Sequence, residues 1–471
     1  MGKLYIQLFL IFLLSITTEL KAQTFDSFIE FGTTLHGGSY VPLWQVSNVH
    51  GFSSVDNHAY LRGGVFYDKK LNNWKFSTGI DVGVTTGFSS KLIIQQAYFD
   101  ASYKKWFGIS FGSKELDSPL LNQQLSSGGL TWSGNARPIP QLALGIFDYI
   151  PLRRNILFKG KISYGLLTDN NYQKKQVGDN YWYTKDIKYH HKSFFFRFGK
   201  PQGRWVFDLG MSLDCFFGGY NIGGGIFFGD LGNSLKDYWR AFIPQNGNWS
   251  SSQTYFQGNF MGSEHLKLTY NHPQVTVSAY LENYYDDFSG MFKQNGGDGL
   301  WGMEFALKES KAINKVVIEY YQTTHQSGPL HGPDDSVVKK TNGADDYYNN
   351  HWYPAWAHWG MTMANPLIAS PIYNKDGDMT VKYNRVKAIH LGWSGIINKE
   401  ISYTSKLSYN QTWGTPFKPT IDILENFSTF VEGSYFPERW PLWSVKLSVA
   451  FDIGEIYGDN IGIQVKVKRK F

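Results

Sequence analysis

The sequence lacks the features of several large classes of protein. Beyond residue 22, no apolar run approaches the about 18 residues that a membrane-spanning helix needs, and the mean hydropathy is −0.32. The one cysteine, Cys215, excludes an intrachain disulfide, and it lies too far from the amino terminus to anchor a lipoprotein. Charged residues make up 18% of the chain and the net charge is only +6, with no basic cluster typical of a nucleic-acid surface. These absences exclude a helical membrane bundle, a disulfide framework and a nucleic-acid-binding protein.

The sequence also lacks the intact motifs of common enzymes. Gly-x-Ser-x-Gly is not found, and residues 392–395 (Gly-Trp-Ser-Gly) are an incomplete version of it. There is no phosphate-binding glycine loop and no His-Glu-x-x-His. The 12 histidines are scattered without acidic partners at metal-ligand spacing. We therefore expect no enzyme, no metal and no cofactor, although a lone serine and histidine on the outer wall of a membrane lipase would escape this search.

The first 22 residues are typical of a secretory signal peptide. Lys3 gives a positive start, and residues 8–16 form an apolar core that is too short to span a membrane as a helix. Cleavage after Ala22 would leave residues 23–471 as an exported chain. Only helices and closed sheets satisfy every backbone polar group in lipid, so a β-barrel is the remaining way for this chain to cross a membrane.

Apolar and polar residues alternate with a period of two in many segments. Residues 74–84 and 461–471 each have one apolar or aromatic row and one polar or small row, and this period places the two rows on opposite faces of a strand. A soluble sandwich has the same period, but the length of the rows and the aromatic residues at their ends favour an outer face in lipid. At roughly 25 residues per strand and connection, the chain makes about 18 strands of an all-β, transmembrane antiparallel barrel.

Residues 116–152 interrupt this alternation. Within them, residues 125–140 hold two prolines and three glycines and show no useful strand period. Irregular backbone at membrane depth is tolerated only inside protein or beside a wet cavity. We therefore expect residues 116–152 to form a plug in the lumen or at the periplasmic mouth of the barrel.

The run at residues 126–140 (Ser-Ser-Gly-Gly-Leu-Thr-Trp-Ser-Gly-Asn-Ala-Arg-Pro-Ile-Pro) resembles the signature of the Wzi capsule assembly family in its Bacteroidota form. The resemblance covers nearly the whole mature chain. It implies an outer-membrane barrel of about eighteen strands, a plug on the periplasmic side, and a role in holding capsular polysaccharide at the cell surface. It implies no mapped sugar site. Further runs follow in the order of the family: residues 258–263, 287–291, 298–302, 324–329, 345–350 and 390–392.

One candidate ligand-binding stretch is rich in aromatic and amide side chains. It holds Tyr347, Tyr348, Asn349, Asn350 and Trp352. Aromatic rings offer flat apolar faces on which sugars stack, and amides bond sugar hydroxyls. The alternative is a girdle at the membrane interface together with loop packing, because Tyr and Trp favour that zone. We favour this alternative for the stretch as a whole. Within it, the two asparagines are the better candidates for ligand binding, since amides do not serve a girdle.

Acidic residues mark a second candidate stretch, Asp287 and Asp298 with Trp301. Paired carboxylates can perform acid–base chemistry on a glycosidic bond or help to hold Ca²⁺, but the spacing matches no known loop motif. The alternative is turn or lumen polarity, which we favour over catalysis and metal binding.

The third candidate group lies in the irregular segment and comprises Trp132, Asn135 and Arg137. The planar guanidinium of Arg137 suits an acidic sugar or a phosphate. The alternative, which we favour, is a plug contact in which Arg137 pairs with a carboxylate of the barrel wall.

Together these features predict an outer-membrane protein that binds capsular or other surface polysaccharide and helps to attach or assemble it at the cell surface, without chemistry. The expected partners are that polysaccharide, outer-membrane lipid and other outer-membrane assembly proteins, but no nucleic acid. The alternative is an outer-membrane channel for solutes or oligosaccharides, lined by the polar inward rows. A structural part in a larger outer-membrane assembly is a third possibility.

Overall fold

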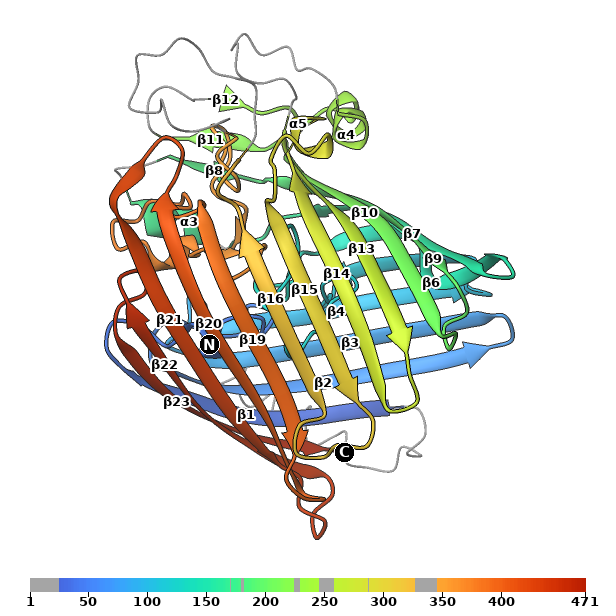
Figure 1. The fold of residues 1–471 in the computed structure, drawn as a ribbon. Coiled ribbons are helices and arrows are strands. Elements are labelled where there is room, and N and C mark those ends of the chain that lie inside the picture. The colour runs from blue at the N-terminus through green and yellow to red at the C-terminus, as the bar shows by residue number, and fades with distance from the viewer. Residues whose placement is uncertain are drawn as a thin grey trace, which may run out of the picture.

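A closed antiparallel barrel of 18 strands dominates the fold (Figure 1). The computed structural model describes residues 25–169, 171–178, 182–223, 229–244, 258–286, 288–326 and 345–471. The predicted signal peptide and Asp287 lie outside these ranges. The first and last strands pair with each other, from Phe28 opposite Lys470 to Gly37 opposite Ile461, and this pairing closes the barrel. The predicted fold class is confirmed.

Each wall strand pairs with the wall strand before and after it in sequence, so the barrel is a series of hairpins. The wall strands are β1 (Phe25–Gly37), β2 (His58–Leu71), β3 (Trp74–Thr86), β4 (Leu92–Tyr103), β5 (Phe107–Ser113), β6 (Gln141–Arg153), β7 (Ile156–Leu166), β9 (Lys188–Phe198), β10 (Trp205–Phe217), β13 (Asn259–Asn271), β14 (Val275–Tyr285), β15 (Gly299–Leu307), β16 (Lys315–Gln322), β19 (Val386–Ile396), β20 (Ile401–Gly414), β21 (Pro419–Tyr435), β22 (Trp443–Gly454) and β23 (Asn460–Lys470).

The connections carry the shorter elements. These are α2 (Leu43–Val46), α3 (Tyr172–Val177), α4 (Leu235–Phe242), α5 (Phe288–Met291), the 3₁₀ turn η1 (Pro371–Tyr373), and the short strands β8 (Tyr183–Lys185), β11 (Tyr220–Ile222), β12 (Gly229–Asp230), β17 (Ala357–His358) and β18 (Met361–Thr362). Figure 1 shows α4, α5, β8, β11 and β12 gathered at one end of the barrel. Among the described residues, no helix is both long and apolar enough to cross a membrane.

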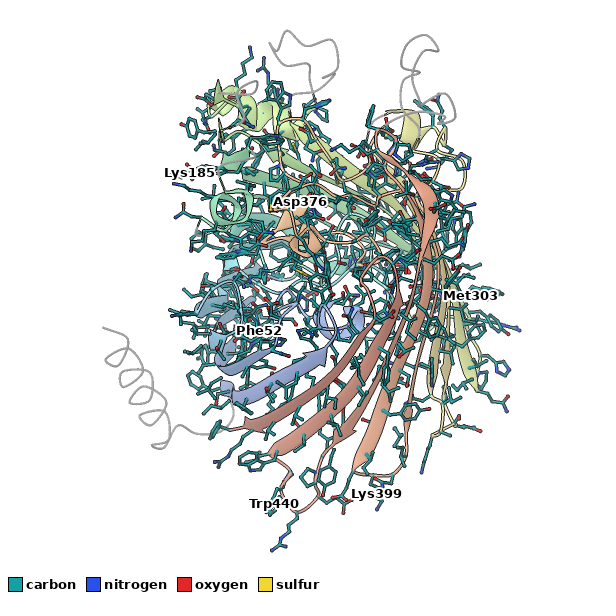
Figure 2. All side chains as sticks on the ribbon, turned by 90° about the vertical axis from the view of Figure 1, so that its left-hand side faces the viewer. Phe52, Lys185, Met303, Asp376, Lys399 and Trp440 are labelled. Carbon is teal, nitrogen blue, oxygen red and sulfur yellow. The ribbon has the colours of Figure 1, made fainter. Side chains whose placement is uncertain are left out.

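The alternation in the sequence becomes the two faces of the wall. On β3 and β23, Ile80 and Ile463 point outward and are 47% and 50% exposed. Their neighbours Asp81 and Gln464 point inward and are buried. Met303 likewise points away from the barrel (Figure 2). The outer face is therefore apolar and the inner face polar, as residues 74–84 and 461–471 predict.

The two ends of the barrel differ in the length of their connections. At one end the hairpins turn tightly, as between β2 and β3, where Asn72 adopts a φ of +52°. Asparagine tolerates this left-handed conformation, which tight two-residue turns need. Lys399 and Trp440 lie in other turns at this end (Figure 2). The long connections, residues 38–57, 114–140 and 323–385, all leave the wall at the opposite end.

The irregular segment differs from its prediction in its bounds. Residues 141–152 belong to β6, which begins directly after Pro140, so only residues 114–140 are irregular. This segment lies in the lumen, as one of the two predicted positions requires. It is joined to the wall at the end that carries the long connections. The reason is topological: β5 runs away from a short turn, so the segment that follows it begins at the opposite end of the barrel.

Candidate functional site

Two long connections pack against each other inside the barrel. We call residues 114–140 and 345–385 together the plug. The Trp356 indole N–H donates to the Thr131 carbonyl over 2.9 Å, and the Asn365 amide donates to the Gly128 carbonyl over 2.6 Å. Trp356 and Leu130 are fully buried. The polar inner face of the wall therefore encloses a largely apolar core formed by the plug.

A buried carboxylate anchors the plug to the wall. Glu319 of β16 accepts hydrogen bonds from the Ser127 backbone N–H at 2.7 Å and from the Ser127 and Ser126 hydroxyls at 2.6 Å. The Tyr280 hydroxyl of β14 donates to the same carboxylate at 2.6 Å. Nearby, Glu282 accepts the Leu130 N–H at 2.9 Å. Charge-assisted bonds of this kind are about twice as strong as neutral ones, so they hold the plug firmly.

A second contact joins the plug to β19. The Leu125 carbonyl lies 2.8 Å from Nε2 of His390, whose Nδ1 lies 2.7 Å from the Ser408 hydroxyl. A Cβ atom added to Gly392 would come within 2.3 Å of that same carbonyl oxygen. Glycine is therefore required at this position for the plug to approach the wall, because any side chain would occupy the space of the Leu125 carbonyl.

Inside the plug, His358 bridges two backbone segments. Its Nδ1 lies 2.9 Å from the Arg137 carbonyl, and its Nε2 lies 3.2 Å from the Thr168 backbone nitrogen. Its Nε2 also lies 2.7 Å from the Thr168 carbonyl oxygen, and a neutral ring can donate to only one of the two carbonyls. With the proton on Nδ1, the ring donates to Arg137 and accepts the Thr168 N–H at Nε2. Burial, together with the nearby Arg137 cation, lowers the pKa of His358 to about 4, although its backbone hydrogen bonds oppose this shift.

This neutral histidine predicts that the plug loosens in mild acid. Its pKa is about 4 in the closed plug and 6.5 in water, so the opened plug binds the proton first. The stabilisation from His358 is complete above pH 6.5 and is lost as the pH falls toward 4. Between pH 7 and pH 5 the loss is about 2 kcal/mol. We expect faster amide hydrogen exchange in residues 357–363 at pH 5, after correction for intrinsic rates. A His358→Asn variant should show a smaller pH effect, and an equal effect would contradict this role.

Between the plug and the short-turn end lies a cavity of about 950 Å³, within the usual size range of ligand pockets. We call it the vestibule. Inward-facing residues of β3, β4, β5, β6, β7, β9 and β10 form its sides. The mouth is formed by residues of the turn after β2 and by Lys104 and Lys105. The inner end is formed by plug residues 116–120 with Thr131 and Trp132.

Trp132 presents a fixed aromatic ring at the inner end of the vestibule. Its indole N–H donates to the Leu116 carbonyl over 3.1 Å, and its ring lies 6.3 Å from the Tyr189 ring. The Ser118 hydroxyl donates to the Trp132 carbonyl at 3.0 Å. Because the ring is already held by these contacts, a ligand that stacks on it loses little further side-chain entropy.

The side wall of the vestibule carries a hydrogen-bonded network. Asp214 of β10 accepts from the Tyr189 hydroxyl, and its Oδ1 lies 2.8 Å from His191 Nδ1. His191 Nε2 lies 3.0 Å from the Ser193 hydroxyl. Tyr189, His191 and Ser193 lie on one inward row of β9. Asp214 of β10 lies directly opposite His191, so the pairing of the two strands brings the four side chains together.

Of the predicted site residues that the structure describes, Trp132 alone lines the vestibule. Asn135 is fully buried and donates to the Thr362 carbonyl at 3.0 Å. Arg137 is a plug contact, as the alternative interpretation states, but its partners are the Trp359 ring at 4.2 Å and the Ser89 hydroxyl at 3.0 Å rather than a wall carboxylate. Burial lowers the pKa of Arg137 to about 10.

The aromatic and amide stretch belongs to the plug core rather than to an exposed loop. Tyr347 and Tyr348 are fully buried, with ring centroids 4.0 and 5.3 Å from that of Tyr284. The Asn349 amide pairs with both backbone groups of Val381, and the Asn350 side chain accepts the Trp352 N–H at 2.9 Å. Trp352 is half-buried against the same core. These groups shape the plug: the rings of Tyr347 and Tyr348 pack in its core, and the Asn349 amide is bonded through both its nitrogen and its oxygen.

The acidic stretch is divided between two roles. Asp298 is fully buried and accepts the backbone N–H groups of His325 and Gln326 at 3.1 and 2.9 Å, which orders the chain after β16. Trp301 faces outward on β15 and donates to the Gly297 carbonyl at 3.2 Å. Its 46% exposed ring lies where an interfacial aromatic girdle is expected. The structure does not bring Asp298 and Trp301 into a common site.

Sequence reasoning missed the lysines of the vestibule. Lys159 and Lys161 occupy successive inward positions of β7 and line the cavity together with Lys75 and Lys114. The pattern Lys-Gly-Lys at positions 159–161 already places two ammonium groups on one face of a strand. That signal was present in the sequence, but only barrel closure sets this face against the other lysines.

No protein-family model and no curated protein matches this sequence. Among solved structures, the chain is similar to Wzi from Escherichia coli, described as a carbohydrate-binding β-barrel of the outer membrane involved in group 1 capsule assembly, at 11% identity and a TM-score of 0.53, covering 93% of this chain and 83% of that one. It is also similar to OccAB4 from Acinetobacter baumannii, at 9% identity and a TM-score of 0.50, covering 95% and 99%. Both are likenesses of fold. The chain has the fold of an outer-membrane barrel.

Proposed function

We propose that this protein is an outer-membrane barrel that binds capsular or other surface polysaccharide and helps to attach or assemble it, without chemistry. The observation that carries the proposal is the position of Trp132, a fixed aromatic ring at the inner end of a polar cavity. Stacking on such a ring and hydrogen bonding to the polar walls are the contacts that sugars offer. The motif resemblance to the Wzi family and the likeness in fold to Wzi support the same proposal.

Membrane position follows from the apolar outer face. A band of exposed Ile, Leu, Phe and Val side chains surrounds the wall, and in water such a band would be strongly unfavourable. In barrels of this kind the short turns face the periplasm. The vestibule then opens toward the periplasm, and the plug is attached on the outer side. This orientation favours binding of a chain during its assembly over contact through outer loops.

The plug argues against the alternative function, a channel for solutes. In the described part of the chain, plug residues such as Leu125, Ser127 and Tyr348 are fully buried between the vestibule and the long-connection end. Passive flow through this core would require many buried hydrogen bonds to break. Large steady currents from the wild-type protein in planar bilayers would favour the channel instead.

An esterase is the enzyme class that the vestibule wall most resembles. Asp214, His191 and Ser193 have the partner order of a catalytic triad. However, the backbone beside Ser193 is paired with Lys161 on one side and Ser212 on the other. No pair of backbone N–H groups is therefore free to stabilise an oxyanion there. We interpret the network as a means of holding the wall side chains.

The proposal is tested in cells. A deletion strain should retain less polysaccharide at its surface, measured by quantitative staining or by release into the medium. The wild-type gene and a Trp132→Phe variant should restore retention, because phenylalanine keeps an aromatic face. Trp132→Ala should restore it poorly, whereas Trp440→Ala, which removes an exposed ring at a short turn, should restore it fully. Unchanged retention in the deletion strain would remove the proposed function and leave the fold intact.

A further inference from the structure

The vestibule is lined by more cations than anions. Its lining includes seven lysines and four aspartates, which gives a formal charge of +3 when His191 is neutral. Lys114 pairs with Asp100 at 2.6 Å. Within the described ranges, no carboxylate oxygen lies within 4.0 Å of the other lining lysines, which are Lys70, Lys75, Lys104, Lys105, Lys159 and Lys161.

Five of these lysines form two groups at different depths. Lys70, Lys104 and Lys105 belong to the mouth, where the turns after β2 and β4 end. Lys159 and Lys161 lie inside on β7, and the Lys159 ammonium is 4.9 Å from the Tyr149 ring centroid and 5.0 Å from that of Phe195. Deeper in, Trp132 ends the cavity. A ligand that enters through the mouth therefore passes the lysines of the mouth, then Lys159 and Lys161, and finally the aromatic face of Trp132.

Ammonium groups gathered in a concave site repel one another unless an anion joins them. A cleft lined by charge of one sign also concentrates counter-ions, because its low-dielectric walls focus the field. Lysine is a flexible point charge, unlike the planar fork of arginine. Such groups suit a ligand whose negative charges recur along a flexible chain rather than one rigid anion in a fixed geometry.

We propose that the vestibule binds an anionic glycan, a chain whose sugars carry carboxylate or phosphate groups, and that Lys159 and Lys161 hold these groups while Trp132 stacks on a sugar ring. This inference rests on the proposed function and names its class of ligand. The glycan reaches the site through the mouth at the short-turn end. Neutral glycans carry no anionic group for Lys159 and Lys161 to bind, so they bind weakly.

The full-length protein in detergent tests this directly by calorimetry. The probes are a galacturonate oligomer and a maltose oligomer of the same length. We expect the galacturonate oligomer to bind and its affinity to fall steeply as NaCl rises from about 50 to about 300 mM. A Lys159→Gln, Lys161→Gln double variant should lose about tenfold or more in affinity, because charge-assisted hydrogen bonds are removed. Lys159→Arg with Lys161→Arg should retain most of it.

A matched control separates local from overall charge. Lys311→Gln with Lys399→Gln removes the same two charges from short turns that do not line the vestibule, and should leave affinity unchanged. Each variant should keep the heat-modifiable gel mobility of a folded barrel. Inorganic phosphate and anionic phospholipid micelles serve as competitors, and both should compete poorly.

The outcomes are distinct. Equal binding of the two oligomers, or unchanged affinity in the glutamine double variant, overturns the anionic class. Competition by inorganic phosphate alone at similar affinity, or by lipid micelles, overturns the glycan in favour of a small anion or a headgroup. If the maltose oligomer binds and only Trp132→Ala weakens it, the proposed function stands and the anionic inference fails. Binding of neither oligomer counts against both.

Discussion

Replacing Glu319 by alanine is expected to open the barrel. The substitution removes the acceptor for Ser126, Ser127 and Tyr280 at once and leaves their donors buried without partners. Losing several bonds to a buried carboxylate costs on the order of 3–5 kcal/mol. This loss of stability affects the plug, because the wall strands keep their backbone hydrogen bonds. We expect bursts of current in planar bilayers and protease cleavage within residues 114–140, and we expect neither from the wild-type protein.

The matched control is Glu432→Ala. Glu432 is also a buried lumen carboxylate, but it bonds to Lys446 within the wall, 2.8 Å away, and not to the plug. That variant should remain closed and protected. If Glu319→Ala stays closed while its barrel is intact, the anchoring role is wrong and packing of the plug core alone holds it in place.

The second large effect concerns the outer face of the wall. Ile80→Arg places a charge at the middle of β3 on the outward row, where Ile80 is 47% exposed in the isolated chain. In a bilayer this position faces hydrocarbon, and arginine at the midplane of a barrel costs about 2–4 kcal/mol. We expect this loss in reversible unfolding by denaturant from lipid vesicles, together with slower insertion.

Ser77→Arg is the control on the same strand. Ser77 lies three positions away, faces inward and lines the vestibule, so an arginine there remains in water. It should cost little in unfolding free energy. If the two variants are destabilised equally, or if Ile80→Arg is harmless, the outward row does not face lipid and the membrane position is wrong.

Strand periodicity carried most of the fold prediction, and its failures have local causes. The strands at residues 74–84 and 461–471 were predictable because a strand that separates lipid from water must alternate strictly. The start of β6 was missed because Pro138 and Pro140 end the irregular segment directly before it, and because its ladder with β7 is interrupted between Ile146 and Ile150.

The candidate site was predicted less well, because residue type does not distinguish a ligand contact from a core contact. Tyr347 and Tyr348 have the composition of a sugar site, yet they form the centre of the plug. Trp132 is the one predicted residue within the described ranges that lines the vestibule. Its role depends on which face of its ring stays uncovered, and this is decided by the packing of Leu116 and Tyr189 around it.

The runs that resemble the Wzi family acquire a common physical meaning in three dimensions. Besides its contacts with Glu319, the run at residues 126–140 makes hydrogen bonds to two of the other runs. The Thr131 and Ser263 hydroxyls lie 2.9 Å apart, and the Tyr348 hydroxyl donates to the Leu130 carbonyl at 3.0 Å. The run at residues 390–392 meets Leu125, directly before that segment. Motifs far apart in sequence therefore converge on the interface between plug and wall.

By itself, the sequence determined the two faces of the strands with a clear alternation, the all-β class and the presence of an irregular segment. These follow from local rules, because a period of two and backbone hydrogen bonding in lipid act on neighbouring residues. Only the tertiary structure decided from which end the plug enters, which aromatic ring stays uncovered and which lysines share a cavity. Those properties depend on strands far apart in the chain being brought together when β1 pairs with β23 and the wall closes.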